Sequence, residues 1–157
     1  VELGDTPVII EEKVSFSSSE EIEREQQILL GTIESWRRAW EENDAENYLS
    51  YYSDNFLTEK WDASTWRDHK LNVNTQNERR RILINDLSVL KSKNIYHIRF
   101  VQTYTSSTLN DVGFKHLFLV KEANGLKIVS ENWTPLKQFS ASPAFRYAYK
   151  ESAQNSM

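Results

Sequence analysis

The sequence predicts an α+β domain of cone-like form, in which one long helix and two shorter helices pack on a curved four-stranded antiparallel sheet. Two observations carry this prediction. Apolar residues recur at helical spacing between residues 20 and 42, and four runs with strand character lie between residues 82 and 133. Helices followed by a run of hairpin-connected strands are typical of the α+β class.

The long helix is expected from about Glu20 to Glu42. Steps of seven, four, three and four residues bring its apolar positions onto one face, while charged side chains occupy the other. These apolar positions are Ile22, Leu29, Ile33, Trp36 and Trp40. The serines at 17–19 serve as a linker or as an N-cap, with Ser19 and Glu23 giving a loose capping box.

Two shorter helices are expected next. Asp44 is positioned to cap a short helix that contains Tyr48 and Tyr52. The segment from Ala63 to about Arg81 is interpreted as a third helix. The adjoining Arg79–Arg81 run is interpreted as a solvated turn between helix and sheet.

Strands are expected at residues 82–90, 95–106, 113–121 and 126–133. The breaks between them contain turn-forming residues, and Asn124-Gly125 is the strongest of these because it favours a type I′ hairpin turn. Side chains alternate between the two faces of a strand. In the strand 95–106, this alternation puts Phe100, Gln102 and Tyr104 on the apolar face, toward the long helix.

Composition narrows the classes of function. The 157 residues suffice for one domain, and a net charge of −4 provides no long-range attraction for nucleic acid. The absence of cysteine excludes disulfides and thiolate chemistry within the chain. No apolar run approaches the roughly 18–20 residues that span a bilayer, so no membrane span is expected. Five Trp, seven Tyr and seven Phe favour ring-lined surfaces.

The two ends differ from the middle. Residues 1–16 are interpreted as a strand and linker left from a preceding module, residues 17–136 as the domain, and residues 137–157 as a flexible or docking tail.

Particular residues resemble a known family. The helical residues Trp36, Trp40, Tyr48, Tyr51 and Phe56 resemble the opening signature of nuclear transport factor two-like (cystatin-like roll, SnoaL-like) domains at the C-terminus of bacterial L,D-transpeptidase and L,D-carboxypeptidase proteins. The sheet carries a matching pattern, Phe100-x-Gln102-x-Tyr104-x-Ser106, Lys115-x-Leu117-x-Leu119 and Lys127-Ile128-x2-Glu131-x-Trp133. The resemblance extends from about Glu20 to Trp133. The run Gly4–Ile10 also looks like the closing strand of a transpeptidase catalytic domain.

This resemblance implies an accessory domain of a bacterial protein that processes peptidoglycan, located in the periplasm or cell envelope. The implied partners are peptidoglycan fragments, the preceding catalytic module or a second copy of the chain. No cofactor is implied.

Several side chains are candidates for a ligand pocket. Gln102 and Tyr104 either orient a ligand at the mouth of the cone or satisfy buried groups, and neither alternative is favoured. Lys115 and Glu131 form either a plain cross-strand ion pair or a charged pair at the pocket floor that recognises an amine or a carboxylate.

The aromatic and histidine residues add further candidates. Four tryptophans belong either to the core or to an aromatic wall, namely Trp36, Trp40, Trp66 and Trp133. Trp61 lies in a polar loop and is expected to be exposed. His116 alternates with two phenylalanines and is expected to face the interior. The three histidines include no i, i+4 pair, so no metal site is predicted.

Three hypotheses for function remain open. In the first, the chain is a non-catalytic accessory domain that assists muropeptide or glycan binding or self-association, with no catalytic residue of its own. In the second, it is a small enzyme of the ketosteroid isomerase or dehydratase type, which requires a carboxylate of raised pKa in a closed cavity. In the third, it is a dimerisation module, with Val101, Leu117 and Leu119 on an apolar outer sheet face.

Overall fold

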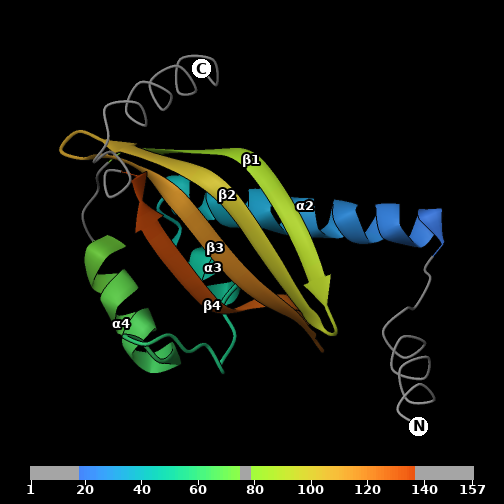
Figure 1. Ribbon diagram of the computed structural model, residues 1–157. Helices are drawn as coiled ribbons and strands as arrows, with labels where there is room; N and C mark the ends of the chain where they lie inside the picture. The colour runs from blue at the N-terminus through green and yellow to red at the C-terminus, as the bar shows by residue number, and fades with distance from the viewer. Residues whose placement is uncertain (1–17, 75–78, 137–157) are drawn as a thin grey trace, which may run out of the picture. The chain divides into compact units, whose positions relative to one another are not determined.

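The computed structural model describes residues 18–74 and 79–136 (Figure 1). The chain divides into two compact units, residues 1–33 and residues 34–157. The strand and linker predicted for residues 1–16 and the tail predicted for residues 137–157 lie outside the described residues. Among the described residues, no helix has the length and apolarity needed to cross a membrane.

The described part of the first unit begins helix α2 (Ser19–Glu41). A capping box opens this helix. The Ser18 hydroxyl accepts a hydrogen bond from the Glu21 backbone N–H at 3.2 Å, and the Glu21 carboxylate accepts one from the Ser18 N–H at 3.3 Å. The box is therefore built on Ser18 and Glu21, and the pairing of Ser19 with Glu23 expected from the sequence was wrong.

The second unit contains the last turns of α2, two more helices and the sheet. The helices are α3 (Ala45–Ser50) and α4 (Ala63–Asn74). The strands are β1 (Arg80–Ser92), β2 (Ile95–Ser106), β3 (Asn110–Glu122) and β4 (Gly125–Pro135). They form one antiparallel sheet in the order β1-β2-β3-β4, and Figure 1 shows α3 and the last turns of α2 behind it. The predicted α+β fold is thus confirmed.

Local hydrogen bonds explain where the short helices begin. Asp44 caps α3 by accepting from the backbone N–H of Asn47 at 3.3 Å, as expected. At the start of α4, Asp62 and Thr65 bond reciprocally, each side chain accepting from the backbone N–H of the other at 2.8 and 2.9 Å. The prediction of a third helix that reaches Arg81 was wrong, because α4 ends at Asn74 and the chain enters β1 at residue 80.

The sheet turns and bends where the sequence provides suitable residues. Gly125, the first residue of β4, has a φ of 117° and pairs with Glu122, so a hairpin forms where it was predicted. A type I′ turn needs a positive φ at both central residues, and Asn124 does not have one, so the predicted turn type was wrong. A register shift between Asn85 and Ser88 in β1, with Asp86 at a φ of 55°, marks a β-bulge. A second shift follows Phe118 in β3. Bulges of this kind increase the local bend and twist of a strand, which suits a curved sheet.

The two faces of the sheet differ sharply in burial. On the inner face, Ile98, Phe100, Leu117 and Leu119 are each 0% exposed. The residues that alternate with them therefore point to the other face, and the expectation that His116 faces the interior was wrong. Aromatic side chains occur on both faces of the sheet, for example Phe100 on the inner face and Phe118 on the outer face. The alternation of His116 with phenylalanines therefore did not show which face it occupies.

The imidazole of His116 lies instead against that of His97, with 2.8 Å between its Nδ1 and the His97 Nε2. Their rings stack at 5.0 Å between centroids, and His97 also stacks on Phe118 at 4.5 Å. Burial, and then the charges of His97 and Arg99, lower the pKa of His116. This pair belongs to the outer face of the sheet.

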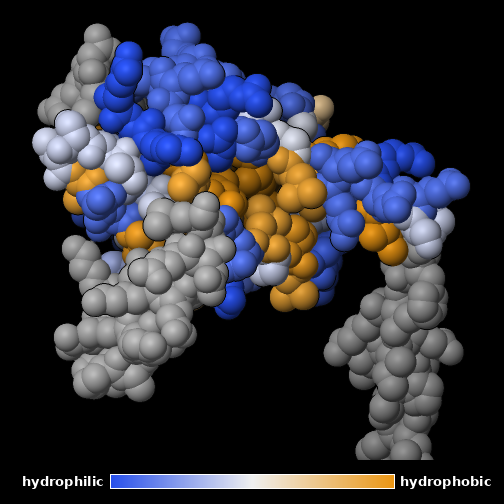
Figure 2. Space-filling model, turned by 90° about the horizontal axis from the view of Figure 1, so that it is seen from above, coloured by the Kyte–Doolittle hydropathy of each residue, from blue (hydrophilic) through white to orange (hydrophobic). Residues whose placement is uncertain are grey.

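The apolar surface of the molecule is visible in Figure 2, where hydrophobic residues (orange) gather on part of the face shown. Exposed apolar side chains are found at the β1–β2 hairpin, where Val89 is 37%, Leu90 66% and Ile95 45% exposed. Leu117 and Leu119, which were expected to contribute to a dimerisation face, are fully buried on the inner side of the sheet. The prediction that Leu117 and Leu119 lie on the outer face of the sheet was therefore wrong.

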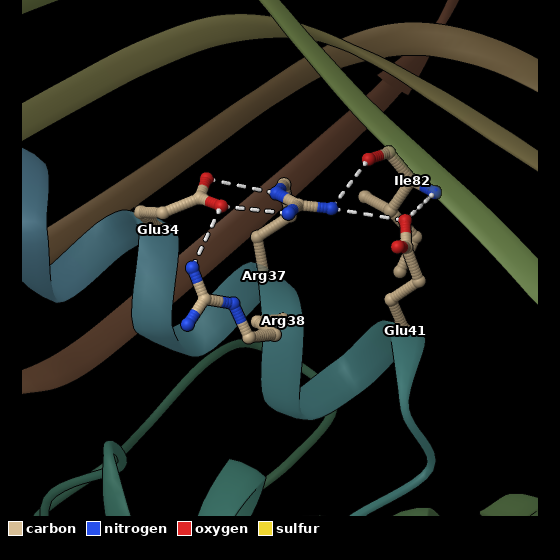
Figure 3. A network of polar contacts seen from close by, with 5 residues as sticks. All are labelled: Glu34, Arg37, Arg38, Glu41 and Ile82. Atoms are coloured by element: carbon tan, nitrogen blue, oxygen red, sulfur yellow. Dashed lines mark hydrogen bonds and ion pairs between the residues drawn. The ribbon is translucent and has the colours of Figure 1, made fainter.

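A polar network joins the end of α2 to β1 (Figure 3). The Arg37 guanidinium donates to Glu34 at 2.7 and 2.9 Å, to Glu41 at 2.9 Å and to the carbonyl oxygen of Ile82 at 3.2 Å. Glu41 also accepts from the Ile82 backbone N–H at 2.9 Å. The network fixes the last turn of α2 against the first strand, and that turn carries Trp40 into the candidate site.

Strand β4 lies close against Gly113 of β3, and alanine is expected to be costly there. A Cβ at this position would lie 2.5 Å from the Thr134 carbonyl oxygen and 2.9 Å from the Trp133 ring. We expect Gly113→Ala to destabilise the fold by about 1–3 kcal/mol in urea unfolding followed by circular dichroism, as overpacking does. The helical Gly31, which has open space around it, is the matched control, and Gly31→Ala is expected to add about 0.5–1 kcal/mol. Equal unfolding midpoints for the two variants would contradict the close approach.

Candidate ligand-binding site

The second unit contains a cavity of about 790 Å³, within the range of small-molecule sites. Its lining comes from α2, α4, the α3–α4 and β2–β3 segments and the sheet. Most of the sheet residues in the lining are on the inner face, but Phe118, Ser130 and Asn132 alternate with them. Seven of the eight residues predicted from the sequence line it, and only His116 does not. The seven are Gln102, Tyr104, Lys115, Glu131, Trp133, Trp66 and Trp61. The prediction of a pocket formed by the sheet and its helices is thus consistent with the structure.

An ion pair between Lys115 and Glu131 lies in this cavity. The Lys115 Nζ is 2.7 Å from Glu131 Oε2, and the two side chains are 9% and 7% exposed. The residues are diagonal across the hairpin, because Lys115 pairs with Trp133 and Glu131 with Leu117. Both alternatives considered for this pair therefore describe it in part, since it is a cross-strand ion pair and also part of the cavity lining.

A chain of hydroxyl groups continues from Glu131 into the core. Tyr52 donates its phenol hydrogen to Glu131 Oε1 at 2.6 Å, and its oxygen lies 2.8 Å from that of Tyr48 and 3.3 Å from the Trp36 indole nitrogen. Because Tyr52 has one proton and gives it to the carboxylate, Tyr48 and Trp36 must be donors to Tyr52. Burial, and then the negative charge of Glu131, raise the pKa of Tyr52 well above 10, which keeps it a donor.

Glu131 is held in its ionised form. Burial alone would raise its pKa, but the charges of Lys115 and Lys70 and the hydrogen bonds from Lys115 and Tyr52 lower the pKa below the ordinary value of 4.5. A general base in an isomerase or dehydratase of this fold would need the opposite shift. The carboxylate of raised pKa that the enzyme hypothesis requires is therefore not provided by Glu131.

Lys70 projects from α4 into a group of aromatic rings. Its Nζ lies 4.7 Å from the centroid of Trp66, 5.4 Å from that of Trp40 and 5.8 Å from that of Tyr48. Burial lowers the pKa of Lys70 to about 8, against the attraction of Glu131. Sequence reasoning did not select Lys70, although Trp66 and Lys70 are four residues apart and so share one face of α4.

Arg80 is a second cation that the sequence interpretation missed. It opens β1, is 8% exposed, and donates to the Asn43 side chain at 3.3 Å. The interpretation of the Arg79–Arg81 run as a solvated turn was wrong for this residue. The reason is alternation within β1, which places Arg80 on the same face as the buried Ile82.

The aromatic lining has a buried part and a part at the edge. Trp40 and Trp66 are each 7% exposed, whereas Trp61 is half-buried and stacks on His69 at 4.4 Å between centroids. The Lys60 ammonium lies 5.1 Å from the Trp61 centroid. Trp36, with 0% exposure, belongs to the core rather than to the wall. Some of the tryptophans, such as Trp40 and Trp66, thus form the wall of the cavity, whereas Trp36 belongs to the core.

Some buried polar atoms of this site lack a hydrogen-bond partner within residues 18–74 and 79–136, and two of them are relevant to ligand binding. They are the Oε1 of Gln102, whose residue is 3% exposed, and the indole nitrogen of Trp66. Unsatisfied buried groups are uncommon and call for an explanation at each site. In the same part of the chain, no three potential ligands from His, Asp or Glu gather into a metal site.

Solved structures of similar fold support the architecture. Bd1075 from Bdellovibrio bacteriovorus matches with a TM-score of 0.70 and 28% identity, over 78% of this chain and 44% of that one. The helical cell shape determining protein Pgp2 from Campylobacter jejuni matches with a TM-score of 0.58 and 22% identity, over 66% and 39% of the two chains. The present chain thus spans less than half the length of either protein.

A third match is an NTF2-like protein of unknown function from Pseudomonas putida, with a TM-score of 0.60 and 13% identity, over 76% of this chain and 89% of that one. Among curated proteins, none shows significant sequence similarity. The family described as the Cds6 C-terminal NTF2-like domain matches residues 28–132, which is more than half of the sequence. The chain therefore belongs to the family of Cds6 C-terminal NTF2-like domains.

Proposed function

We propose that this domain is a non-catalytic, ligand-binding part of a larger bacterial cell-envelope protein, and that its cavity holds fragments of peptidoglycan. The observation that carries the proposal is the cavity itself. It combines tryptophan walls with buried charges, and a site of this kind suits a ligand that has sugar or peptide surfaces together with polar groups.

Two further points support the location and the class of ligand. One structural neighbour is described as a protein that determines helical cell shape, which is a property of the cell wall. The residues that resemble accessory domains of L,D-transpeptidases and L,D-carboxypeptidases include Gln102, Lys115 and Glu131, and these residues line the cavity. A periplasmic or envelope location, and a catalytic module elsewhere in the parent protein, belong to the same proposal.

The chemistry of the site favours binding over catalysis. Glu131 is paired with Lys115 and kept ionised, so it is poorly suited to take a proton from a substrate. The phenol of Tyr52 is already committed to Glu131. Both groups act as a fixed floor rather than as mobile acid-base catalysts.

The proposal is tested by co-sedimentation of the domain with purified sacculi and by titration with soluble muropeptides followed by NMR. We expect retention on sacculi and shifts of the Trp61 and Trp133 indole signals. Trp61→Ala is expected to weaken binding at least about tenfold, as for loss of one stacking platform. Leu90→Ala, at the exposed β1–β2 hairpin, is the control and should bind normally. Absence of both retention and muropeptide-induced shifts would refute the proposed function.

A further inference from the structure

The cavity carries unequal numbers of opposite charges. Its lining includes four basic residues, Lys60, Lys70, Arg80 and Lys115, and three acidic ones, Glu59, Asp111 and Glu131. Lys115 is compensated by its ion pair with Glu131. This leaves an excess of positive charge, so the cavity suits a ligand that carries one negative charge.

Lys70 is the cation best placed to use that charge. In the described part of the chain it forms neither an ion pair nor a hydrogen bond, and its immediate neighbours are the rings of Trp40, Tyr48 and Trp66. Rings stabilise an ammonium by only about 0.5–2 kcal/mol. They do not replace an anion for a group taken out of water, and an uncompensated buried charge is costly. An anionic ligand that reaches Lys70 would compensate it.

Two buried atoms of the same cavity that lack a hydrogen-bond partner in the described part of the chain indicate which donors and acceptors the ligand should have. The Gln102 side chain lines the cavity, and its Oε1 is an acceptor without a partner among the described residues. The terminal torsion of an amide is soft, and a rotation about it is the movement by which this oxygen would face a ligand donor. The Trp66 indole nitrogen, adjacent to Lys70, is a donor without a partner in that same part of the chain. A carboxylate has two oxygens and can accept from an indole and an ammonium together.

We propose that the cavity recognises the free carboxyl-terminal end of a peptide, with its carboxylate at Lys70 and Trp66 and its last amide N–H donating to Gln102. The tryptophan walls leave apolar surface for the side chain of the terminal residue. This inference deepens the proposed function, on which it rests for the larger molecule to which the peptide end belongs, since peptidoglycan stem peptides end in a carboxylate. The recognition of the carboxylate itself is independent of that identification and can be tested with small probes.

The test compares N-acetyl-D-alanyl-D-alanine with its carboxamide, which has the same shape and no charge, by isothermal titration calorimetry and NMR on the whole chain at pH 7. We expect the acid to bind at least about tenfold more tightly than the amide, with a shift of the Trp66 indole signal. Lys70→Met is expected to abolish this preference. Lys121→Met, which removes an exposed lysine of β3 outside the cavity lining, should retain it.

Equal affinities for acid and amide, no binding of either, or a preserved preference in Lys70→Met would overturn the inference. Circular dichroism of each variant confirms that the fold is intact. The two proposals fail in different ways. Binding of the small acid without binding to sacculi or muropeptides would remove the envelope function but not the carboxylate site. Binding to sacculi that Lys70→Met leaves unchanged would do the reverse.

Discussion

Replacing Glu131 with glutamine is expected to destabilise the fold by about 3–5 kcal/mol, because it leaves the buried Lys115 ammonium without its counter-charge. The Lys115 Nζ is 2.7 Å from the carboxylate, and both side chains are less than a tenth exposed. The substitution also weakens the hydrogen bond from Tyr52, whose acceptor changes from a carboxylate to an amide oxygen. Urea unfolding followed by tryptophan fluorescence gives the free energy of unfolding.

The double variant Glu131→Gln with Lys115→Met is the control that separates charge from packing. If the loss arises from an uncompensated ammonium, removing that ammonium as well should restore a large part of the stability. Losses that simply add in the double variant would show that the ion pair contributes little. The same series gives the coupling energy between the two residues.

The pH dependence of Glu131 has a defined sign. The pKa of this carboxyl is lower in the folded protein than its ordinary value of 4.5, so its contribution to stability is present above pH 4.5 and is lost as the pH falls through the lowered pKa. In Glu131→Gln this component is absent. The difference in unfolding free energy between wild type and variant should therefore shrink as the pH is lowered from 6 toward the acid range.

Lys70→Met is expected to act in the opposite direction and stabilise the unliganded protein by about 1–3 kcal/mol at pH 7. Burial lowers the pKa of Lys70 from 10.5 to about 8 in the folded state. Holding the charged form in the fold therefore costs free energy at neutral pH. Methionine has a similar length, no charge, and a sulfur that packs well against aromatic rings.

The pH profile of this variant provides the check. For a basic group whose pKa is lowered in the folded state, the penalty is absent above pH 10.5, grows as the pH falls from 10.5 to about 8, and is constant at lower pH. The advantage of Lys70→Met should hence be full below pH 8 and diminish between pH 8 and 10.5. The buried Tyr48 and Tyr52 also contribute to the pH dependence of stability, but they are present in both proteins. Their contributions therefore cancel in the difference in unfolding free energy. Lys60→Met is the control and should show neither effect, whereas a loss of stability in Lys70→Met would contradict the argument.

The fold was accessible to sequence reasoning because its signals are local. The strand boundaries follow from alternation and from turn residues such as Asn124-Gly125, and they agree with the structure to within a few residues. The end of the third helix was not accessible in this way. No strong stop follows Asn74, and the start of β1 is set by pairing with β2, where Arg80 lies opposite Ser106. That partner is distant in sequence.

The site was only partly accessible for a related reason. Gln102 was found because a polar residue on the apolar face of a strand is conspicuous. Lys115 and Glu131 were found because they are opposite charges on two strands that the Asn124-Gly125 hairpin joins. Lys70 was overlooked because a lysine on a short helix is usually solvated, and only its spacing from Trp66 pointed inward. His116 lies on the outer face because its neighbour Lys115 lies on the inner face. A lysine can be buried there because Glu131 is its ion-pair partner.

The chain of donors from Trp36 through Tyr52 to Glu131 joins the centre of the core to the cavity. A change of ligand preference at this end of the site would disturb packing at the same time, since each member depends on the next for a satisfied hydrogen bond. Residues at the edge of the cavity, such as Trp61 and Lys60, are not members of this hydrogen-bond chain. Differences in ligand specificity among such domains are therefore expected to arise from residues at the edge of the cavity. The floor residues Tyr52, Lys115 and Glu131 are expected to change only together with the core.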